Sequence, residues 1–152
     1  MKKINIGLIG FGNVGEGLVK LLKERKGLIK DKTGFEFCIK KICDKDTRRR
    51  RAVKVERGIL TSSPSEILKD QSIDIVVELI GGVHPAKEYI VQALNNGKHI
   101  VTANKALLAE EGRDIFKLAE RRKRNIYFEA SVGAGIPVIK TLREGLLTNR
   151  IN

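Results

Sequence analysis

The chain has 152 residues, 41% of them hydrophobic and only 5% aromatic, which is enough for one buried core of mainly aliphatic side chains. No apolar run approaches the length of a membrane span, and two cysteines, Cys38 and Cys43, do not make a disulfide scaffold. The net charge of +12 suggests nucleic-acid binding, but the basic blocks at 48–51 and 121–124 lack interleaved aromatic residues for base stacking. We therefore expect a cytoplasmic protein of one domain.

The first strand, turn and helix are predicted at the N-terminus. Residues 4–10 form an isoleucine-rich run, and apolar residues at helical spacing then continue as far as Gly27. The turn between them reads GFGNVG, a complete G-x-G-x-x-G motif in the position that binds a dinucleotide pyrophosphate. The alternative is a glycine turn that binds nothing. The predicted cofactor-binding residues here are Gly10, Phe11, Gly12, Asn13, Val14 and Gly15.

The second strand is predicted at residues 35–43, after a loop insertion at residues 27–34. Asp44 ends this strand, where an acidic side chain accepts the ribose hydroxyls of NAD. Lys45 and the arginine run at residues 48–51, which begins with Arg48, follow directly, and cations at this place could hold the 2′-phosphate of NADP. The two features point to different cofactors, and the cations favour NADP slightly. The alternative for the arginine run is a solvated face.

Strands and helices continue to alternate along the rest of the chain. The remaining strands are predicted at residues 58–61, 73–80, 98–102 and 126–130. The remaining helices are predicted to begin at Pro64, Pro85, Lys105 and Pro137. This alternation predicts an α/β fold, a Rossmann-type doubly wound parallel sheet of about six strands, in a single domain over residues 1–152.

Three of the later strands end in distinctive segments, VVELIGG, VTANK and FEASVGAGIP. The carboxyl ends of parallel strands face one crevice, so Ile80, Gly81 and Thr102 are added to the predicted cofactor-binding residues. Lys105 is less easily explained, because it begins a helix, where the positive end of the helix dipole disfavours a cation. It either has a function at the crevice or extends to solvent or to a phosphate.

The segments GFGNVG, VVELIGG, VTANKALLA and FEASVGAGIP, in this order, resemble the N-terminal nucleotide-binding half of homoserine dehydrogenases. The resemblance covers essentially the whole chain. It implies reduction of aspartate 4-semialdehyde to homoserine with NADH or NADPH, on the route to threonine, methionine and isoleucine.

The resemblance also implies roles for residues of the later segments. Lys105 would lie beside the nicotinamide and the substrate as a cofactor-binding and catalytic residue, where a cation or acid lowers the barrier to forming an alkoxide. A monovalent cation, Na⁺ or K⁺, would be bound by the Glu129 carboxylate and nearby backbone carbonyls. The alternative is that Glu129 caps the turn by accepting backbone N–H bonds. The residues implied for the cation are Glu129, Val132, Ala134 and Ile136.

Homoserine dehydrogenases continue beyond this half into a domain that supplies a catalytic aspartate and a second lysine and builds the dimer, and these 152 residues contain no such domain. We therefore expect the chain to bind a dinucleotide but to be incomplete for catalysis, with no membrane association and no nucleic-acid partner. Two alternatives remain open. One is a non-catalytic dinucleotide-binding module with a basic nucleic-acid-binding face, and the other is the nucleotide half of a related amino-acid dehydrogenase.

Overall fold

A six-stranded parallel sheet forms the centre of the computed structural model, which describes residues 2–145. Its strand order is β3-β2-β1-β4-β5-β6, and every neighbouring pair is parallel. The strands are β1 (Lys2–Ile9), β2 (Phe35–Cys43), β3 (Leu60–Thr61), β4 (Ile75–Glu78), β5 (His99–Thr102) and β6 (Ile126–Tyr127). The predicted doubly wound sheet of six strands is thus confirmed.

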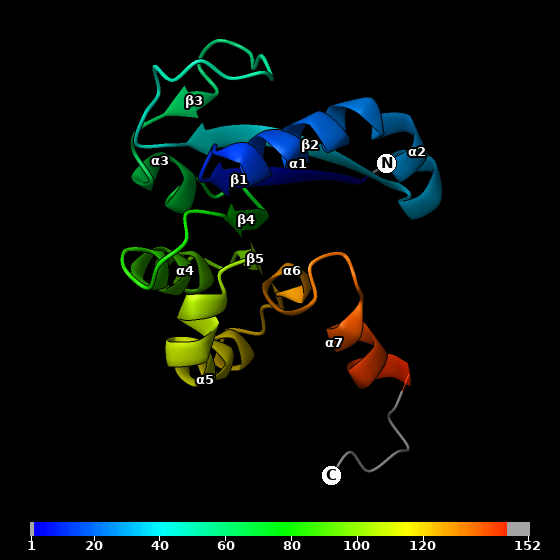
Figure 1. The fold of residues 1–152 in the computed structure, drawn as a ribbon, viewed down its shortest axis with the longest axis vertical. Helices are drawn as coiled ribbons and strands as arrows, with labels where there is room; N and C mark the ends of the chain where they lie inside the picture. The colour runs from blue at the N-terminus through cyan, green and yellow to red at the C-terminus, as the bar shows by residue number, and fades with distance from the viewer. Residues whose placement is uncertain (1, 146–152) are drawn as a thin grey trace.

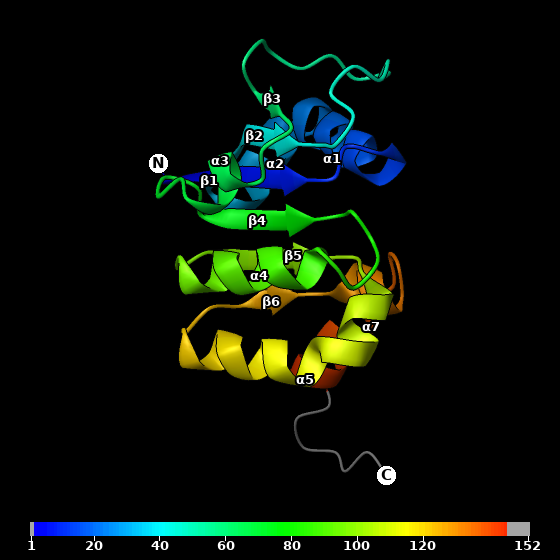
Figure 2. The same ribbon diagram turned by 90° about the vertical axis from the view of Figure 1, so that its left-hand side faces the viewer.

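Helices cover the two faces of the sheet unequally. Figure 2 shows α3, α4 and α5 across one face, whereas α1 and α2 lie behind the β1–β2 half on the other face. The segment containing α6 and α7 lies on the side of the sheet away from α4 (Figure 1). The helices are α1 (Asn13–Glu24), α2 (Lys26–Thr33), α3 (Ser65–Leu68), α4 (Ala86–Asn95), α5 (Lys105–Arg121), α6 (Glu129–Val132) and α7 (Val138–Lys140), followed by a π-helical turn, η1 (Thr141–Gly145).

Alternating strand residues divide the core into two clusters, as the period of two in a strand requires. On β1, Leu8 packs with Val19 of α1 and Val77 of β4, in the cluster on the α1 face. The next residue, Ile9, belongs to the other cluster, which contains Ile100 and the buried residues of α4 and α5. Both clusters are mainly aliphatic, as the composition predicts, and Phe11 is the aromatic member of the cluster on the α1 face. No helix among the described residues is both long and apolar enough to cross a membrane.

Two local predictions are wrong. Residues 27–34 were expected to be a loop, but Lys26–Thr33 form α2, which ends at Gly34 in the left-handed conformation (φ 73°). None of the α2 residues is buried in the structure. A helix with no buried face needs no apolar stripe, and without such a stripe the sequence does not show that this segment is helical. The last strand ends at Tyr127 rather than at residue 130, because Glu129 already begins α6.

The strand order reverses between β1 and β4, which lie side by side although 65 residues lie between Ile9 and Ile75. The chain leaves β1 toward β2 on one side and returns to β4 on the other. Such a switch point opens a crevice at the carboxyl ends of the strands, where α/β proteins bind ligands.

Candidate functional site

The glycine turn joins β1 to α1 at the switch point, and its three glycines have different roles. Gly10 has φ 103°, and a Cβ there would lie 2.7 Å from the Leu79 backbone. A Cβ on Gly15 would lie 2.3 Å from the Gly10 carbonyl oxygen. On Gly12, by contrast, an added Cβ would meet no atom of the described residues within 4 Å. The fold therefore requires Gly10 and Gly15, whereas Gly12 keeps open the space in front of the α1 N-terminus, where a helix binds anions.

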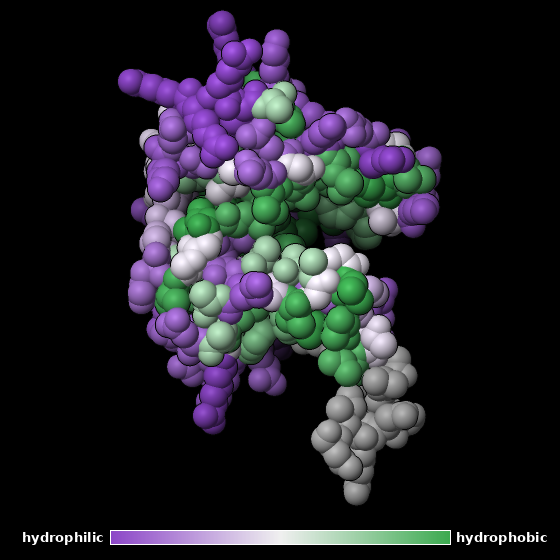
Figure 3. Space-filling view, in the orientation of Figure 1, coloured by the Kyte–Doolittle hydropathy of each residue, from purple (hydrophilic) through white to green (hydrophobic). Residues whose placement is uncertain are grey.

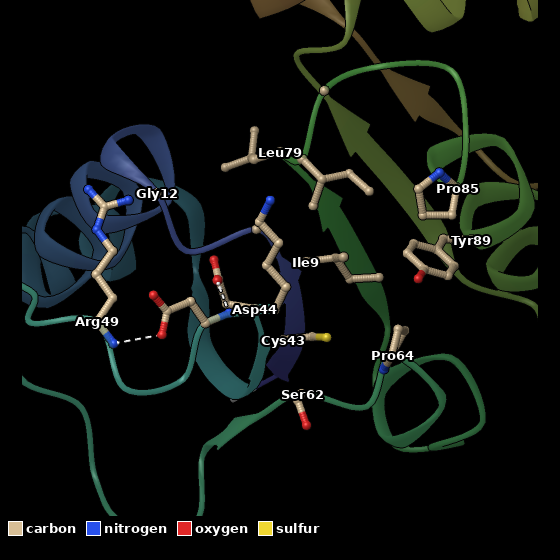
Figure 4. Close-up of a pocket in the computed structure, with 15 residues that line it drawn as sticks. Ile9, Gly12, Cys43, Asp44, Arg49, Ser62, Pro64, Leu79, Pro85 and Tyr89 are labelled. Carbon is tan, nitrogen blue, oxygen red and sulfur yellow. Dashed lines mark hydrogen bonds between the residues drawn. The ribbon is translucent and has the colours of Figure 1, made fainter.

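A cavity of about 530 Å³ opens beside this turn. Figure 4 shows Arg49 and Asp44 on one side of it, and Pro85 and Tyr89 on the other. Six of the predicted cofactor-binding residues line it, namely Gly10, Gly12, Asp44, Lys45, Ile80 and Gly81. The cavity thus combines apolar walls with carboxylate and cationic groups at one end, as a nucleoside site requires.

Cys43 lines the cavity at the end of β2 and is only 5% exposed. Burial raises the pKa of its thiol to about 11, and the negative charges of Asp44 and Glu66 act in the same direction. The thiol therefore remains protonated at neutral pH, and Cys38 is likewise a free thiol in the structure.

Asp44 contacts the glycine turn directly. Its Oδ2 accepts a hydrogen bond of 2.6 Å from the Phe11 backbone N–H, and its Oδ1 accepts one of 2.9 Å from the Asp46 N–H. Arg51 pairs with the same Oδ1 at 3.3 Å. The predicted ribose acceptor is at the cavity, but its two oxygens already have protein partners.

The arginine run does not behave as one solvated face. Arg49 lines the cavity, and its Nη2 donates to the Asn13 side-chain oxygen at 3.3 Å. The Arg51 side chain is nearly buried, whereas Arg48 is exposed and is not among the residues that line the cavity. Of the two cations predicted to face a 2′-phosphate, Lys45 lies at the cavity and Arg48 does not.

A hydrogen-bonded network joins the carboxyl ends of β4 and β5. The fully buried Glu78 accepts from the Thr102 hydroxyl at 2.7 Å through Oε2, and from the Ile80 N–H at 2.9 Å through Oε1. Asn104 accepts from the Leu107 N–H as the N-cap of α5, and donates to the Gly82 carbonyl at 2.6 Å. Thr102 is therefore buried beneath the crevice and supports the site rather than lining it.

Lys105 is exposed as the first residue of α5, directly after the Asn104 cap. A smaller cavity of about 210 Å³ lies beside this helix start, at the edge of the sheet. Its lining residues come from the glycine turn, the β4 loop and the β5 loop, and are Val14, Leu79, Ile80, Gly81, Ala103 and Asn104. The glycine turn, the VVELIGG segment and the VTANK segment therefore meet here, whereas no residue of FEASVGAGIP lines this cavity.

The turn after β6 brings together the four residues implied for a monovalent cation. Glu129 accepts from the Ile139 N–H at 3.1 Å and from the Lys140 N–H at 2.6 Å. The Ile136 carbonyl accepts from the Val138 N–H at 2.8 Å. Glu129 thus makes the capping hydrogen bonds of the alternative interpretation, with Val132 and Ala134 in the same turn.

Sequence reasoning missed several residues that build the site. Asn104 could have been recognised, because an asparagine directly before an apolar helix is a typical N-cap. Glu78 had no such local signal, because its partner Thr102 lies far away in the chain. The sequence indicated the arginine run as a whole, but not that Arg49 lines the cavity while Arg51 is held against Phe11. Across residues 2–145, no cluster of three or more His, Cys, Asp or Glu side chains could hold a metal ion.

Comparisons with known proteins identify the family of this chain. The family model of the homoserine dehydrogenase NAD-binding domain matches residues 10–129. The homoserine dehydrogenase of Bacillus subtilis is 42% identical over 151 residues, which are 99% of this chain and 35% of that protein. The chain thus spans about a third of the length of the relatives it matches.

Two solved structures are also similar. The crystal structure of a homoserine dehydrogenase from Thiobacillus denitrificans matches 99% of this chain and 35% of its own, with a TM-score of 0.92 and 44% identity. A hyperthermophilic archaeal homoserine dehydrogenase in complex with NADPH matches 92% of this chain and 48% of its own, with a TM-score of 0.75 and 26% identity. The chain therefore belongs to the homoserine dehydrogenase family, in which it corresponds to the NAD-binding domain.

Proposed function

We propose that this chain is the cofactor-binding part of a homoserine dehydrogenase, acting with NADP in the interconversion of homoserine and aspartate 4-semialdehyde. One observation carries the proposal. The open space at Gly12, the α1 N-terminus and the lined cavity lie next to the VTANK segment, at one edge of the sheet.

The residues present fit a dinucleotide. The Gly12–Asn13 backbone would hold the pyrophosphate, because the first N–H groups of α1 have no partners within the helix. The cavity between Asp44 and Tyr89 would hold the adenosine. When bound, the nicotinamide supplies or accepts the hydride. Lys105 would stabilise the charge that develops on the substrate oxygen, since it is an exposed cation at the same edge of the sheet.

NADP is favoured over NAD by the charges around the cavity. Lys45 and Arg49 both line it, and neither has an ion-pair partner among residues 2–145. The Asp44 and Asp46 carboxylates also line the cavity but accept backbone N–H groups, so a 2′-phosphate would give the two cations a charged partner. The sequence predicted that Arg48 contacts the 2′-phosphate. We assign this role to Arg49 instead, because Arg49 lines the cavity and Arg48 does not.

The monovalent cation at the turn after β6 stays a prediction. Glu129 would have to exchange its two backbone N–H partners for an ion, so no step of the reaction is assigned to a cation here.

The substrate half of the reaction would need more protein than this chain contains. Several large apolar side chains are exposed near the crevice, including Val14 (64%), Ile80 (38%), Val132 (54%) and Ile136 (67%). In Figure 3, apolar surface lines a hollow on this side of the molecule. Exposed apolar surface of this kind is typical of an interaction site. We propose that the rest of the enzyme packs here and binds the amino and carboxylate groups of the substrate.

Two glycine variants test the dinucleotide site. Gly12→Ala should fold normally, because its Cβ has open space, but should bind NADPH at least about tenfold more weakly, since the Cβ occupies the place of the pyrophosphate. Gly15→Ala should instead lower the melting temperature, because its Cβ clashes with the Gly10 carbonyl. Fluorescence titration and thermal unfolding measure the two effects. Unchanged NADPH affinity in Gly12→Ala would contradict the proposed site.

A further inference from the structure

Arg51 fastens the arginine loop to the glycine turn. Its guanidinium carbon lies 4.8 Å from the centre of the Phe11 ring, and its Nε donates to the Phe11 carbonyl at 2.9 Å. Its other nitrogens donate to the Arg49 carbonyl at 3.1 Å and to the Asp46 carbonyl at 2.7 Å. With 5% of the side chain exposed, this guanidinium is committed to the protein and is not free to bind a ligand.

Asp44 completes the arrangement. It accepts the Phe11 N–H, while Arg51 takes the Phe11 carbonyl, so the two residues hold both backbone groups of Phe11 between Gly10 and Gly12. Asp44 and Arg51 also pair with each other, at 3.3 Å. Because both side chains are largely buried, this pairing screens the Asp44 charge more strongly than an exposed pair would.

The pairing changes what Asp44 can do. An acidic residue at the end of the second strand normally accepts the ribose 2′-hydroxyl of NAD, and its charge repels the 2′-phosphate of NADP. We propose that Arg51 is a specificity-determining positioning residue. By neutralising Asp44, it allows the cations of Lys45 and Arg49 to select the 2′-phosphate. This inference rests on the proposed function and extends it to the choice of cofactor.

The test is the ratio of the NADH and NADPH dissociation constants of this chain. Arg51→Met keeps the apolar contact with Phe11 but removes the charge, so the preference for NADPH should fall about tenfold. Adding Asp44→Asn should restore the ratio to within about threefold of the unaltered chain, because the repelling carboxylate is then gone. Arg51→Lys keeps the charge and should keep the ratio. Equal weakening of both cofactors by Arg51→Met would make Arg51 a purely structural residue and overturn the inference.

Asp44→Asn alone gives a second measurement, which does not depend on the folding of an Arg51 variant. Both affinities can fall together, because Asp44 also holds the Phe11 N–H, but the ratio of the two dissociation constants should stay within about threefold of the unaltered chain. A tenfold loss of NADH affinity without a loss of NADPH affinity would identify Asp44 as a free ribose acceptor and overturn the inference. Arg50→Met removes the same charge from an exposed position and serves as the control, with an unchanged ratio expected. If the unaltered chain binds neither dinucleotide, the proposed function fails and the inference fails with it.

Discussion

At the scale of single residues, the pKa of the Cys43 thiol is raised by burial in the wall of the cavity. Its pKa of about 11 lies above the ordinary value of 9.0, so the neutral thiol is favoured in the folded chain. The folded state therefore binds more protons than the unfolded state between pH 9 and 11. The contribution of Cys43 to stability is present below this window and is lost as the pH rises through it.

The same shift predicts slow alkylation. With Cys38→Ala, Cys43 becomes the only thiol, and its reaction with iodoacetamide at pH 8 should be about a hundredfold slower than that of an ordinary cysteine, because the thiolate is correspondingly rarer. The rate should still be increasing at pH 10. A plateau near pH 9, measured by mass spectrometry of the labelled protein, would contradict the raised pKa.

At the scale of elements, the start of α5 positions Lys105. The Asn104 side chain both caps the helix and donates to the Gly82 carbonyl, so it joins α5 to the loop after β4. The buried Glu78–Thr102 hydrogen bond lies beneath it and joins the ends of β4 and β5. The geometry of the crevice thus depends on polar side chains that are themselves buried.

Asn104→Ala should lower the free energy of unfolding by about 1–2 kcal/mol, because the N–H of Leu107 and the carbonyl of Gly82 both lose a partner. For a chain of this size the melting temperature should fall by about 2–8 °C. Asn104→Ser can still cap the helix but is too short to reach Gly82, so its effect should be intermediate. A melting temperature equal to that of the unaltered chain in the alanine variant would show that the cap contributes nothing.

At the scale of the whole molecule, two observations indicate that catalysis needs a further part of the enzyme. Large apolar side chains are exposed, and the relatives are about three times as long as this chain. The chain alone should bind NADPH but should not oxidise homoserine at a measurable rate, because groups that act as a unit in catalysis fail together. Fusion to the remainder of the Thiobacillus denitrificans enzyme should give NADP-dependent activity. Rapid turnover by the chain alone would contradict this expectation.

In the active fusion, Lys105→Ala should lower kcat at least about a hundredfold, the usual contribution of a proton-transferring or charge-stabilising group. Lys117→Ala is the matched control, since Lys117 is also an exposed lysine of α5. If the two variants are equally active, Lys105 is not catalytic. An absorbance assay at 340 nm follows both reactions.

The sequence by itself determined the architecture and predicted the edge of the sheet at which the candidate site lies. Buried parallel strands and amphipathic helices differ in hydrophobic period, so the order of strands and helices could be predicted locally. The glycine turn could also be predicted from the sequence, because only glycine tolerates the φ of Gly10 and the close approach at Gly15. The family segments VVELIGG, VTANK and FEASVGAGIP then placed three loops along one edge.

The tertiary structure alone decided which charged residues face the cavity. Three arginines of one short run have different surroundings. Arg48 is exposed, Arg49 lines the cavity, and Arg51 is buried against Phe11, which lies 40 residues away in the chain. The helical state of α2 also had no signal, because none of its residues is buried. For the arginines, the outcome depends on contacts between distant segments. Hydrophobic periodicity describes neighbours along the chain and carries no information about such contacts.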